Sequence, residues 1–174
     1  AAAWRFLHEA GVDPAKARTT DALTHYKAEL RSRDVYRVDT ALISAGDTPT
    51  IAHKLFNAET GELCTAMQQT LAGVSLTGPA VVWDGDAREE RSIPGENAGW
   101  VPALRNMVRP NEVDWAGNLS LAGYIHRFST ANSFIMSAFG MTPAYMTTTR
   151  VGLSTFEFQL TFQEQVRSGD MIDI

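Results

Sequence analysis

This sequence of 174 residues has little cysteine, no excess of basic residues and no long apolar run. Cys64 is the one cysteine, which excludes an intrachain disulfide framework and fits a reducing compartment. The formal net charge of -5 gives no support to general nucleic-acid binding, because neutralising phosphates needs a basic surface. No apolar run approaches about 18 residues, and "AAAWRFLHEAG" lacks the layout of a signal peptide. We therefore expect a cytoplasmic protein without a membrane span or a nucleic-acid partner.

Motifs for metal binding and for serine catalysis are missing as well. The four histidines are scattered, and none belongs to an HExxH or Cys/His pattern; they are His8, His25, His53 and His126. No G-x-S-x-G elbow is present to support a Ser-His-Asp triad. We expect neither a metal site nor a serine nucleophile.

The composition that remains is that of a globular protein, with 44% hydrophobic and 20% charged residues. Residues 1–10 are expected to form a helix that Gly11 and Pro14 end. The chain that follows alternates in polarity and is rich in β-branched residues, which predicts strands near 23–31, 34–44, 50–58 and 63–74. The segment "NAETGEL" is expected to form the hairpin turn between the last two strands.

A break in this pattern separates the two halves of the chain. Residues 75–103 contain prolines, glycines and a dense charge cluster from Asp84 to Arg91, which predicts a linker or a long surface loop. Beyond it we expect a strand at 105–110, a helix at 119–139, and strands near 150–166 and 170–174.

An internal repeat relates the two halves. "FLHEAGVDP" at 6–14 aligns with "IMSAFGMTP" at 135–143, and "YKAELRSRDVYRV" at 26–38 aligns with "FQEQVRSGDMIDI" at 162–174. Both copies run from a helix end through a Gly turn and a strand into an Arg-Ser-x-Asp turn. We therefore interpret 1–74 as the C-terminal part of a first repeat, 75–103 as a linker and 104–174 as the N-terminal part of a second. The chain is then a window across a tandem pair, or a permuted domain.

The helix expected at 119–139 carries one apolar stripe. Apolar residues recur at spacings of three and four, which predicts a buried face made of Leu121, Tyr124, Ile125, Phe128, Ala131, Ile135, Ala138 and Phe139. The polar residues fall largely elsewhere; they are His126, Arg127, Thr130 and Ser133. A long helix packed lengthwise into a curved antiparallel sheet is an α+β arrangement.

A carboxylate stands just ahead of this helix. A helix N-terminus carries unpaired N–H groups and the positive end of the dipole. Asp114 is therefore either a local turn or capping residue, or a catalytic carboxylate that faces an oxyanion held by the amides after Gly117 and Asn118. The local pattern leaves both alternatives open.

The stretch "VRPNEVDWAGNLSLAGYIHRFSTA" resembles hotdog-fold acyl-CoA thioesterases of the 4-hydroxybenzoyl-CoA thioesterase type. Their pattern is an Arg, then Asp-x-x-Gly-His-Val-Asn-Asn, then an aromatic residue on a helix. Asp114 matches the catalytic Asp, Gly117 the Gly and Tyr124 the aromatic residue. "RSGDMIDI" and "NAETGELCTAMQQTLAGV" are similar to the family's strand entry and last hairpin. The resemblance implies a hotdog fold, in which a curved antiparallel sheet wraps around a long central helix.

This sequence also departs from the family pattern. Asn118 stands where the family often has His, Ser120 and Leu121 stand in place of the Asn pair, and Ser129 replaces a frequent helix Glu. These departures keep a second alternative open, which is a non-catalytic acyl-thioester-binding or structural hotdog domain. A hotdog hydratase or dehydratase is a third.

The mechanism that the resemblance implies is thioester hydrolysis at the helix N-terminus. A backbone N–H near Gly117 to Leu119 would polarise the carbonyl, an effect worth roughly 3 kcal/mol per good donor. Asp114 would act as general base or as nucleophile. Asn118 or Ser120 would position the water or, alternatively, cap the helix.

Substrate contacts follow from the same resemblance. We expect the substrate to be bound by Arg109, Trp115, Leu119 and Tyr124, with Trp100 and Phe128 as further candidates for an acyl pocket. The substrate would be an acyl-CoA or an acyl-carrier thioester, so no separate cofactor is expected. The fold further implies a homo-oligomer or an intramolecular hotdog pair.

Overall fold

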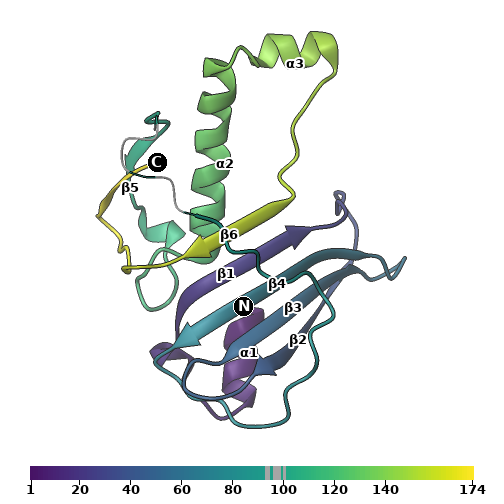
Figure 1. Cartoon of the computed structure of the whole chain (residues 1–174), viewed down its shortest axis with the longest axis vertical. Coiled ribbons are helices and arrows are strands. Elements are labelled where there is room, and N and C mark those ends of the chain that lie inside the picture. Colours follow the sequence, from purple (N-terminus) through teal and green to yellow (C-terminus); the bar gives the residue numbers. More distant parts are fainter. Residues whose placement is uncertain (93–94, 96–98, 100) are drawn as a thin grey trace. The chain divides into compact units, whose positions relative to one another are not determined.

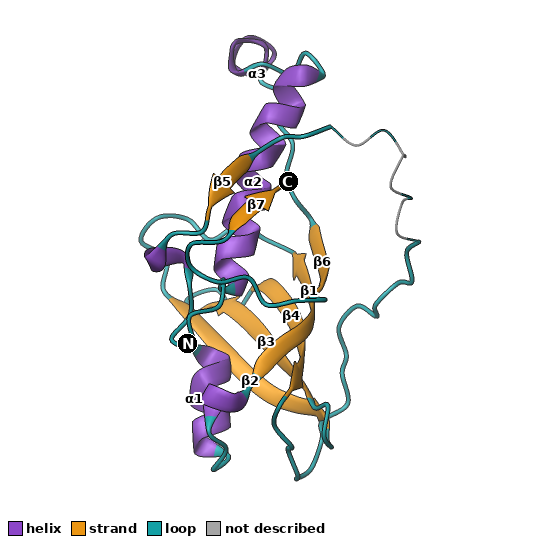
Figure 2. Cartoon of the chain, turned by 90° about the vertical axis from the view of Figure 1, so that its left-hand side faces the viewer, coloured by secondary structure: helices purple, strands orange, loops and turns teal. Residues whose placement is uncertain are grey.

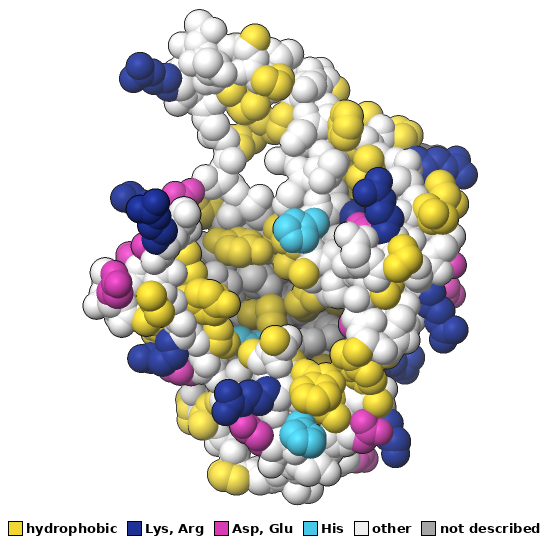
Figure 3. Space-filling view, turned by 180° about the vertical axis from the view of Figure 1, so that it is seen from behind, with side chains coloured by type: hydrophobic (Ala, Val, Ile, Leu, Met, Phe, Trp, Pro, Cys, Tyr) yellow, Lys and Arg dark blue, Asp and Glu magenta, His cyan; other side chains and the backbone are white. Residues whose placement is uncertain are grey.

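The structure is a computed structural model of the chain, and it describes residues 1–92, 95, 99 and 101–174. The chain forms two compact units: unit 1 is Ala1–Glu89 with Thr155–Gln163, and unit 2 is Glu90–Ser154 with Glu164–Ile174. None of the described helices is long and apolar enough to cross a membrane. On the face shown in Figure 3, Lys and Arg side chains lie among Asp and Glu side chains, so this face does not gather one sign of charge.

Unit 1 is built on an antiparallel sheet with the strand order β2-β3-β4-β1-β6 (Figure 1). Its strands are β1 (Arg18–Tyr26), β2 (Tyr36–Ser44), β3 (Thr50–Asn57), β4 (Leu63–Ala72) and β6 (Glu157–Thr161). The predictions for β2, β3, β4 and the turn between β3 and β4 are confirmed to within two residues.

The first strand was predicted wrongly, because it lies five residues earlier than 23–31. Asp13 accepts a hydrogen bond from Ala15 N–H and thereby caps a short 3-10 helix, Pro14–Lys16. This helix ends at Lys16, and β1 begins shortly after it, at Arg18. At the other end, the N–H groups of Lys27 and Ala28 both donate to the Cys64 carbonyl, which ends the regular ladder.

The core of unit 1 lies between the sheet and helix α1 (Ala2–Glu9), which runs along one face of the sheet (Figure 2). Leu7 of α1 is buried against a cluster of sheet and loop residues, namely Leu42, Ile51, Leu71, Val74 and Leu76. The predicted helix at 1–10 is therefore confirmed, and its apolar face covers the sheet.

The predicted linker at 75–103 contains no helix or strand among its described residues. Leu76 pairs with Gly46 through two backbone hydrogen bonds, and the chain then continues along unit 1 as far as Glu89. Residues 93–94, 96–98 and 100 lie outside the described part, so the prediction for Trp100 stays a prediction.

Unit 2 contains helix α2 (Leu121–Ala138), helix α3 (Pro143–Thr149), a short 3-10 helix (Pro110–Glu112) and a two-stranded ladder. In that ladder β5 (Arg105–Met107) pairs antiparallel with β7 (Met171–Asp173). The long helix is confirmed to within two residues, whereas the strands predicted at 105–110, 150–166 and 170–174 are shorter than expected. The sequence analysis missed α3, although Thr142 caps its first turn and Pro143 occupies its first position, and both are start signals.

The buried stripe of α2 differs from the predicted one. Its buried residues are Gly123, Arg127, Ala131 and Met136, whereas Ala138 and Phe139 are exposed. Arg127 was predicted to lie off the buried face, and that prediction is wrong. Its guanidinium is buried because it finds hydrogen-bond partners on the neighbouring segments of unit 2.

The two Arg-Ser-x-Asp turns have the same geometry. In each, the first Arg N–H donates to the Asp carboxylate, at 2.8 Å for Arg31 and 2.7 Å for Arg167. In each, the third residue has a positive φ, 84° at Arg33 and 96° at Gly169. The two Arg-Ser-x-Asp segments that align in the sequence therefore form the same kind of turn.

The pairing of β1 with β6 shows a second regularity. The alignment of 26–38 with 162–174, extended back by three residues, makes Leu23 the counterpart of Gln159. These two residues lie directly opposite one another in the antiparallel register. Pairing of a residue with its own counterpart is what a local two-fold relation between two copies produces.

Candidate functional site

The candidate site is a short irregular hairpin that leads into α2. Ser120 N–H donates to the Glu112 carbonyl at 3.0 Å, Val113 pairs with Leu119, and Asp114 N–H donates to the Asn118 carbonyl at 2.7 Å. A turn closed by Gly117, whose φ is +81°, joins the two sides. Asp114 therefore lies near the tip of the hairpin, two residues beyond Glu112, which is hydrogen-bonded to the residue that precedes α2.

The Asp114 carboxylate does two different things with its two oxygens. Oδ1 accepts hydrogen bonds from Ala116 N–H at 2.8 Å and Asn118 N–H at 3.1 Å, which is the turn-capping arrangement. Oδ2 has no hydrogen-bond partner among the residues that the structure describes. The side chain is half-buried. One oxygen thus holds the turn, and the other is left for a ligand or water.

The backbone donors expected between Gly117 and Leu119 are all engaged within the protein. Gly117 N–H donates to the Asp114 carbonyl at 3.0 Å, Asn118 N–H to Asp114 Oδ1, and Leu119 N–H to the Val166 carbonyl at 2.6 Å. Sequence reasoning missed these bonds because they depend on the hairpin register and on a segment distant in sequence.

The described backbone N–H groups of this site that have no acceptor lie further along the chain, in the first turn of α2. Ser120 is the N-cap of α2, and its hydroxyl accepts from Gly123 N–H at 3.0 Å. Within the described residues, the N–H groups of Leu121 and Ala122 have no acceptor. The positive end of the helix is therefore presented by these two amides.

The remaining candidate residues are distributed around this hairpin. Trp115, at the tip, is 54% exposed, whereas the Leu119 side chain is buried. Tyr124 lies half-buried in the first turns of α2, and burial raises the pKa of its hydroxyl. Arg109 is exposed, and its backbone N–H donates to Glu112 Oε2 at 2.7 Å. The hairpin brings Asp114, Gly117, Asn118 and Ser120 together.

A buried ion pair that sequence reasoning missed supports the base of the hairpin. Arg127 Nη2 donates to Glu112 Oε2 at 2.7 Å and to the Met107 carbonyl at 2.9 Å, while Nη1 donates to Asn106 Oδ1. The hydrogen bond from Arg127 is the largest cause that lowers the pKa of Glu112. Arg127 thereby fixes α2 to β5 and to the start of the hairpin. The one sequence signal was an Arg placed four residues from both Gly123 and Ala131 on the helix.

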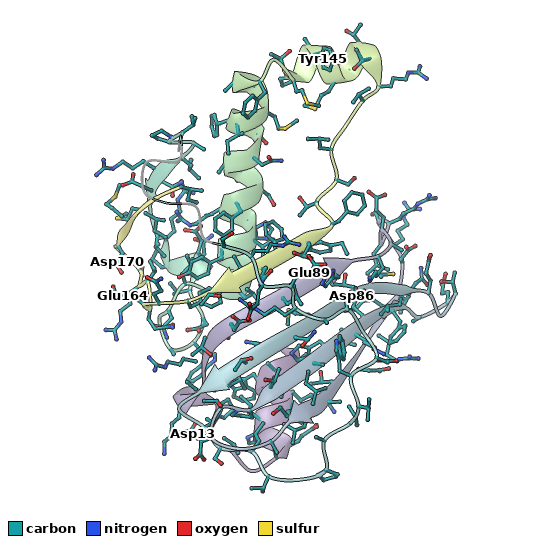
Figure 4. The ribbon with its side chains drawn as sticks, in the orientation of Figure 1. Asp13, Asp86, Glu89, Tyr145, Glu164 and Asp170 are labelled. Atoms are coloured by element: carbon teal, nitrogen blue, oxygen red, sulfur yellow. The ribbon has the colours of Figure 1, made fainter. Side chains whose placement is uncertain are left out.

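The second Arg-Ser-x-Asp turn flanks the same hairpin. Asn118 forms an antiparallel bridge with Arg167, and Val108 exchanges backbone hydrogen bonds with Gly169 and Asp170. Figure 4 labels Asp170, the last residue of this turn, and Glu164, which precedes the turn. Arg109 and Arg167 are thus carried on backbone segments that adjoin the site.

No group of three or more His, Cys, Asp or Glu side chains able to hold a metal ion was found among the residues that are described.

Comparison with known proteins gives relatives in structure only. No family model matches the chain, and no curated protein matches it in sequence. It is similar to an acyl-ACP thioesterase from Bacteroides thetaiotaomicron, with 10% identity over 98% of this chain and 72% of that chain, at a TM-score of 0.64. It is similar to a putative oleoyl thioesterase from Lactobacillus plantarum, with 11% identity over 99% and 70%, at a TM-score of 0.70.

A third structure is a 12:0-ACP thioesterase from Umbellularia californica, with 10% identity over 97% of this chain and 63% of that chain, at a TM-score of 0.59. At these identities the likeness concerns the fold, and the neighbours are hotdog proteins. The 4-hydroxybenzoyl-CoA type stays a prediction. The predicted α+β class is confirmed, and the chain has a hotdog fold.

Proposed function

We propose that this chain takes part in the hydrolysis of acyl thioesters, with Asp114 as general base or nucleophile. The observation that carries the proposal is the Asp114 carboxylate, which is held by Oδ1 on a hairpin that leads straight into α2 and keeps Oδ2 without a partner among the described residues. The names of the three structural neighbours support the reaction class, since each of those proteins is called a thioesterase.

The chemistry follows from this placement. The thioester carbonyl oxygen would accept from Leu121 or Ala122 N–H, and each good donor to the developing oxyanion contributes roughly 3 kcal/mol. Asp114 Oδ2 would take a proton from water, or attack the carbonyl carbon itself. In the general-base route, the C–S bond then breaks, the sulfur leaves as a thiol with the proton that Asp114 took from water, and the acyl group is released as the free acid. In the nucleophilic route, the C–S bond breaks as the acyl group passes to Asp114 as a mixed anhydride, the thiolate takes a proton from solvent, and water then hydrolyses the anhydride to the free acid and the Asp114 carboxylate.

A non-catalytic acyl-thioester-binding domain is the second candidate. Two observations favour it: Asp114 Oδ1 already caps a turn, and the amides of Gly117, Asn118 and Leu119 are engaged within the protein. A hydrolase and a binding domain differ in whether the remaining oxygen, Oδ2, performs chemistry.

Two substitutions of Asp114 separate these candidates. Asp114→Asn keeps an oxygen that can accept from Ala116 and Asn118 N–H but removes the charge, whereas Asp114→Ala removes both. For a catalytic Asp114 we expect thiol release from acyl-CoA and acyl-carrier thioesters to fall about a hundredfold or more in Asp114→Asn, with the fold intact. For a capping Asp114, Asp114→Asn behaves like the wild type, and only Asp114→Ala loses stability, by about 1 kcal/mol.

The assay uses both carriers, because two of the neighbours are named for acyl carrier protein. Thiol release also distinguishes hydrolysis from hydration of the acyl chain, which leaves the thioester intact. Tight binding of acyl thioesters without thiol release would support the binding domain and contradict the hydrolase.

We further propose that the chain spans parts of two tandem hotdog repeats that pair within one molecule. The matching Arg-Ser-x-Asp turns and the Leu23–Gln159 pairing support this arrangement. Light scattering of the protein tests it, because an intramolecular pair gives a monomer at concentrations where a pair made from two chains gives a dimer.

A further inference from the structure

Residues 81–89, which we call the clasp, run across the sheet of unit 1 on the face opposite α1. Ile51 packs on the α1 side, and side chains alternate along a strand, so Lys54 lies on the other face. Lys54 Nζ lies 2.5 Å from Asp84 Oδ1 and 5.5 Å from the centre of the Trp83 ring. Gln68 Nε2 of β4 donates to the Asp86 carbonyl at 2.9 Å. The clasp is thus anchored on β3 and β4.

The clasp then reaches the two strands that meet at the end of the sheet. Asp86 pairs with Lys27, which follows β1, and lies 3.5 Å from His25 Nδ1. Arg88 pairs with Asp21 of β1 and donates to Thr161 Oγ1 of β6 at 2.9 Å. Figure 4 labels Asp86 and Glu89 beside β1 and β6.

One hydrogen bond links the segment of unit 1 that precedes unit 2 in the sequence to the segment of unit 1 that follows it. Gln159 Nε2 of β6 donates to the Glu89 carbonyl at 3.0 Å. Glu89 is the last residue of the preceding segment, and Gln159 belongs to the following one. Without the clasp, the loop that leads to β6 starts at Ala72, the end of β4. The clasp shortens this loop to the stretch after Glu89, which by itself favours closure by less than about twofold.

The charges of the clasp match the local two-fold relation between β1 and β6. Cross-strand partners on either side of the Leu23–Gln159 position are His25 with Glu157 and Asp21 with Thr161. The repeat makes these two partner sets counterparts of each other, yet the charges beside them on the first strand differ: the basic Lys27 follows His25 at one end, and the acidic Asp21 lies at the other. Asp86 pairs with Lys27 and Arg88 pairs with Asp21, so the charges of the clasp match this direction along β1 and not the reverse one.

We infer that the clasp fastens β6 to β1 of the same chain, so that the two strands pair within one molecule and not with a second copy; this inference rests on the intramolecular pairing proposed above. An edge strand can pair with any chain that presents the same sequence. The clasp favours pairing of β6 with β1 of the same chain, because it belongs to that chain and because its charges match those beside the two strands. Exposed ion pairs are individually weak, so we expect the effect to come from the set acting together.

Hydrogen exchange at the two ends of the seam tests this inference without reference to any enzyme activity. Tyr26 N–H donates to the Phe156 carbonyl, and Phe162 N–H donates to the Thr20 carbonyl. In Arg88→Glu we expect both amides to exchange about five- to tenfold faster, and light scattering to show a dimer that grows with protein concentration. The charge-swapped variant Asp21→Arg/Arg88→Glu should restore exchange to within about threefold of the wild type.

The matched control is Lys16→Glu, which makes the same change of charge at an exposed site of unit 1 outside the clasp. Equal exchange in Arg88→Glu and the wild type, or equal acceleration in Lys16→Glu, would overturn the inference. Should Arg88→Glu fail to fold, Arg88→Gln together with Asp86→Asn provides the milder test. Unchanged exchange in that variant, and in the wild type at 1 M NaCl, would equally overturn it.

Discussion

The buried imidazole of His53 predicts how the free energy of unfolding changes with pH. It lies on β3 with 6% of its surface exposed, and Thr40 Oγ1 is 2.8 Å from its Nδ1. Its Nε2 is buried with no hydrogen-bond partner within reach among the described residues. Burial is the largest cause that lowers the pKa of His53 from 6.5 to about 4, and the Gln69 side chain opposes this shift in part. The folded state therefore holds the imidazole neutral.

The magnitude follows from linkage. A group whose pKa is lower in the folded state stabilises the fold above its unfolded pKa and loses that contribution as the pH falls. With an unfolded pKa of 6.5 and a folded pKa of about 4, the loss begins near pH 6.5. It reaches about 2 kcal/mol in the free energy of unfolding at pH 5.

The assay is urea unfolding followed by circular dichroism at pH 7 and pH 5, on the wild type and on His53→Gln. Glutamine is neutral at both pH values and can accept from the Thr40 hydroxyl, so it removes the titration while keeping a polar contact. We expect the wild type to lose about 2 kcal/mol more than the variant between the two pH values. Equal losses would refute the assignment of a neutral, buried imidazole to His53.

Two further predictions concern the support of the hairpin and the turn after β4. Arg127→Met leaves the Glu112 carboxylate without its partner, and we expect unit 2 to lose about 2 kcal/mol, because Glu112 stays 22% exposed and its charge is partly solvated. The double variant Glu112→Gln/Arg127→Met should recover most of this loss in urea unfolding, and an equal loss in both would contradict the ion pair. Gly73→Ala places a Cβ 2.2 Å from the Lys16 carbonyl oxygen at a φ of +80°, whereas Gly61→Ala has a φ of +74° with open space around it. We expect Gly61→Ala to cost about 1 kcal/mol in thermal unfolding and Gly73→Ala about 2 kcal/mol more; equal costs would show that the contact relaxes.

Helices and strands with a clear periodicity of apolar residues were predictable from the sequence. Those whose ends depend on capping or on distant hydrogen bonds were not. β3, β4 and α2 have boundaries within two residues of their predictions, because alternation and helical spacing are local properties of the chain. β1 was misplaced because the bonds to the Cys64 carbonyl that end it come from a strand about forty residues away. α3 carried its start signals in Thr142 and Pro143, but the apolar pattern there is too short to mark a helix.

The candidate site was likewise predictable only in part. The sequence located Asp114 and the start of α2, since an acidic turn followed by an apolar helical stripe is visible in the letters alone. It did not show that Oδ1 of Asp114 is used within the turn, nor that Leu121 and Ala122 carry the free amides. These facts depend on which residues of the hairpin lie opposite one another.

The sequence by itself determined the extents of β3, β4 and α2 and the position of the acidic turn, because each is set by spacing along the chain. Only the tertiary structure decided where charge is buried. Arg127 is buried since Glu112, Asn106 and the Met107 carbonyl converge on it, and His53 is neutral since the sheet excludes water from it. The free energy of a charge depends on the solvent and partners around it, and those are assembled from segments far apart in sequence.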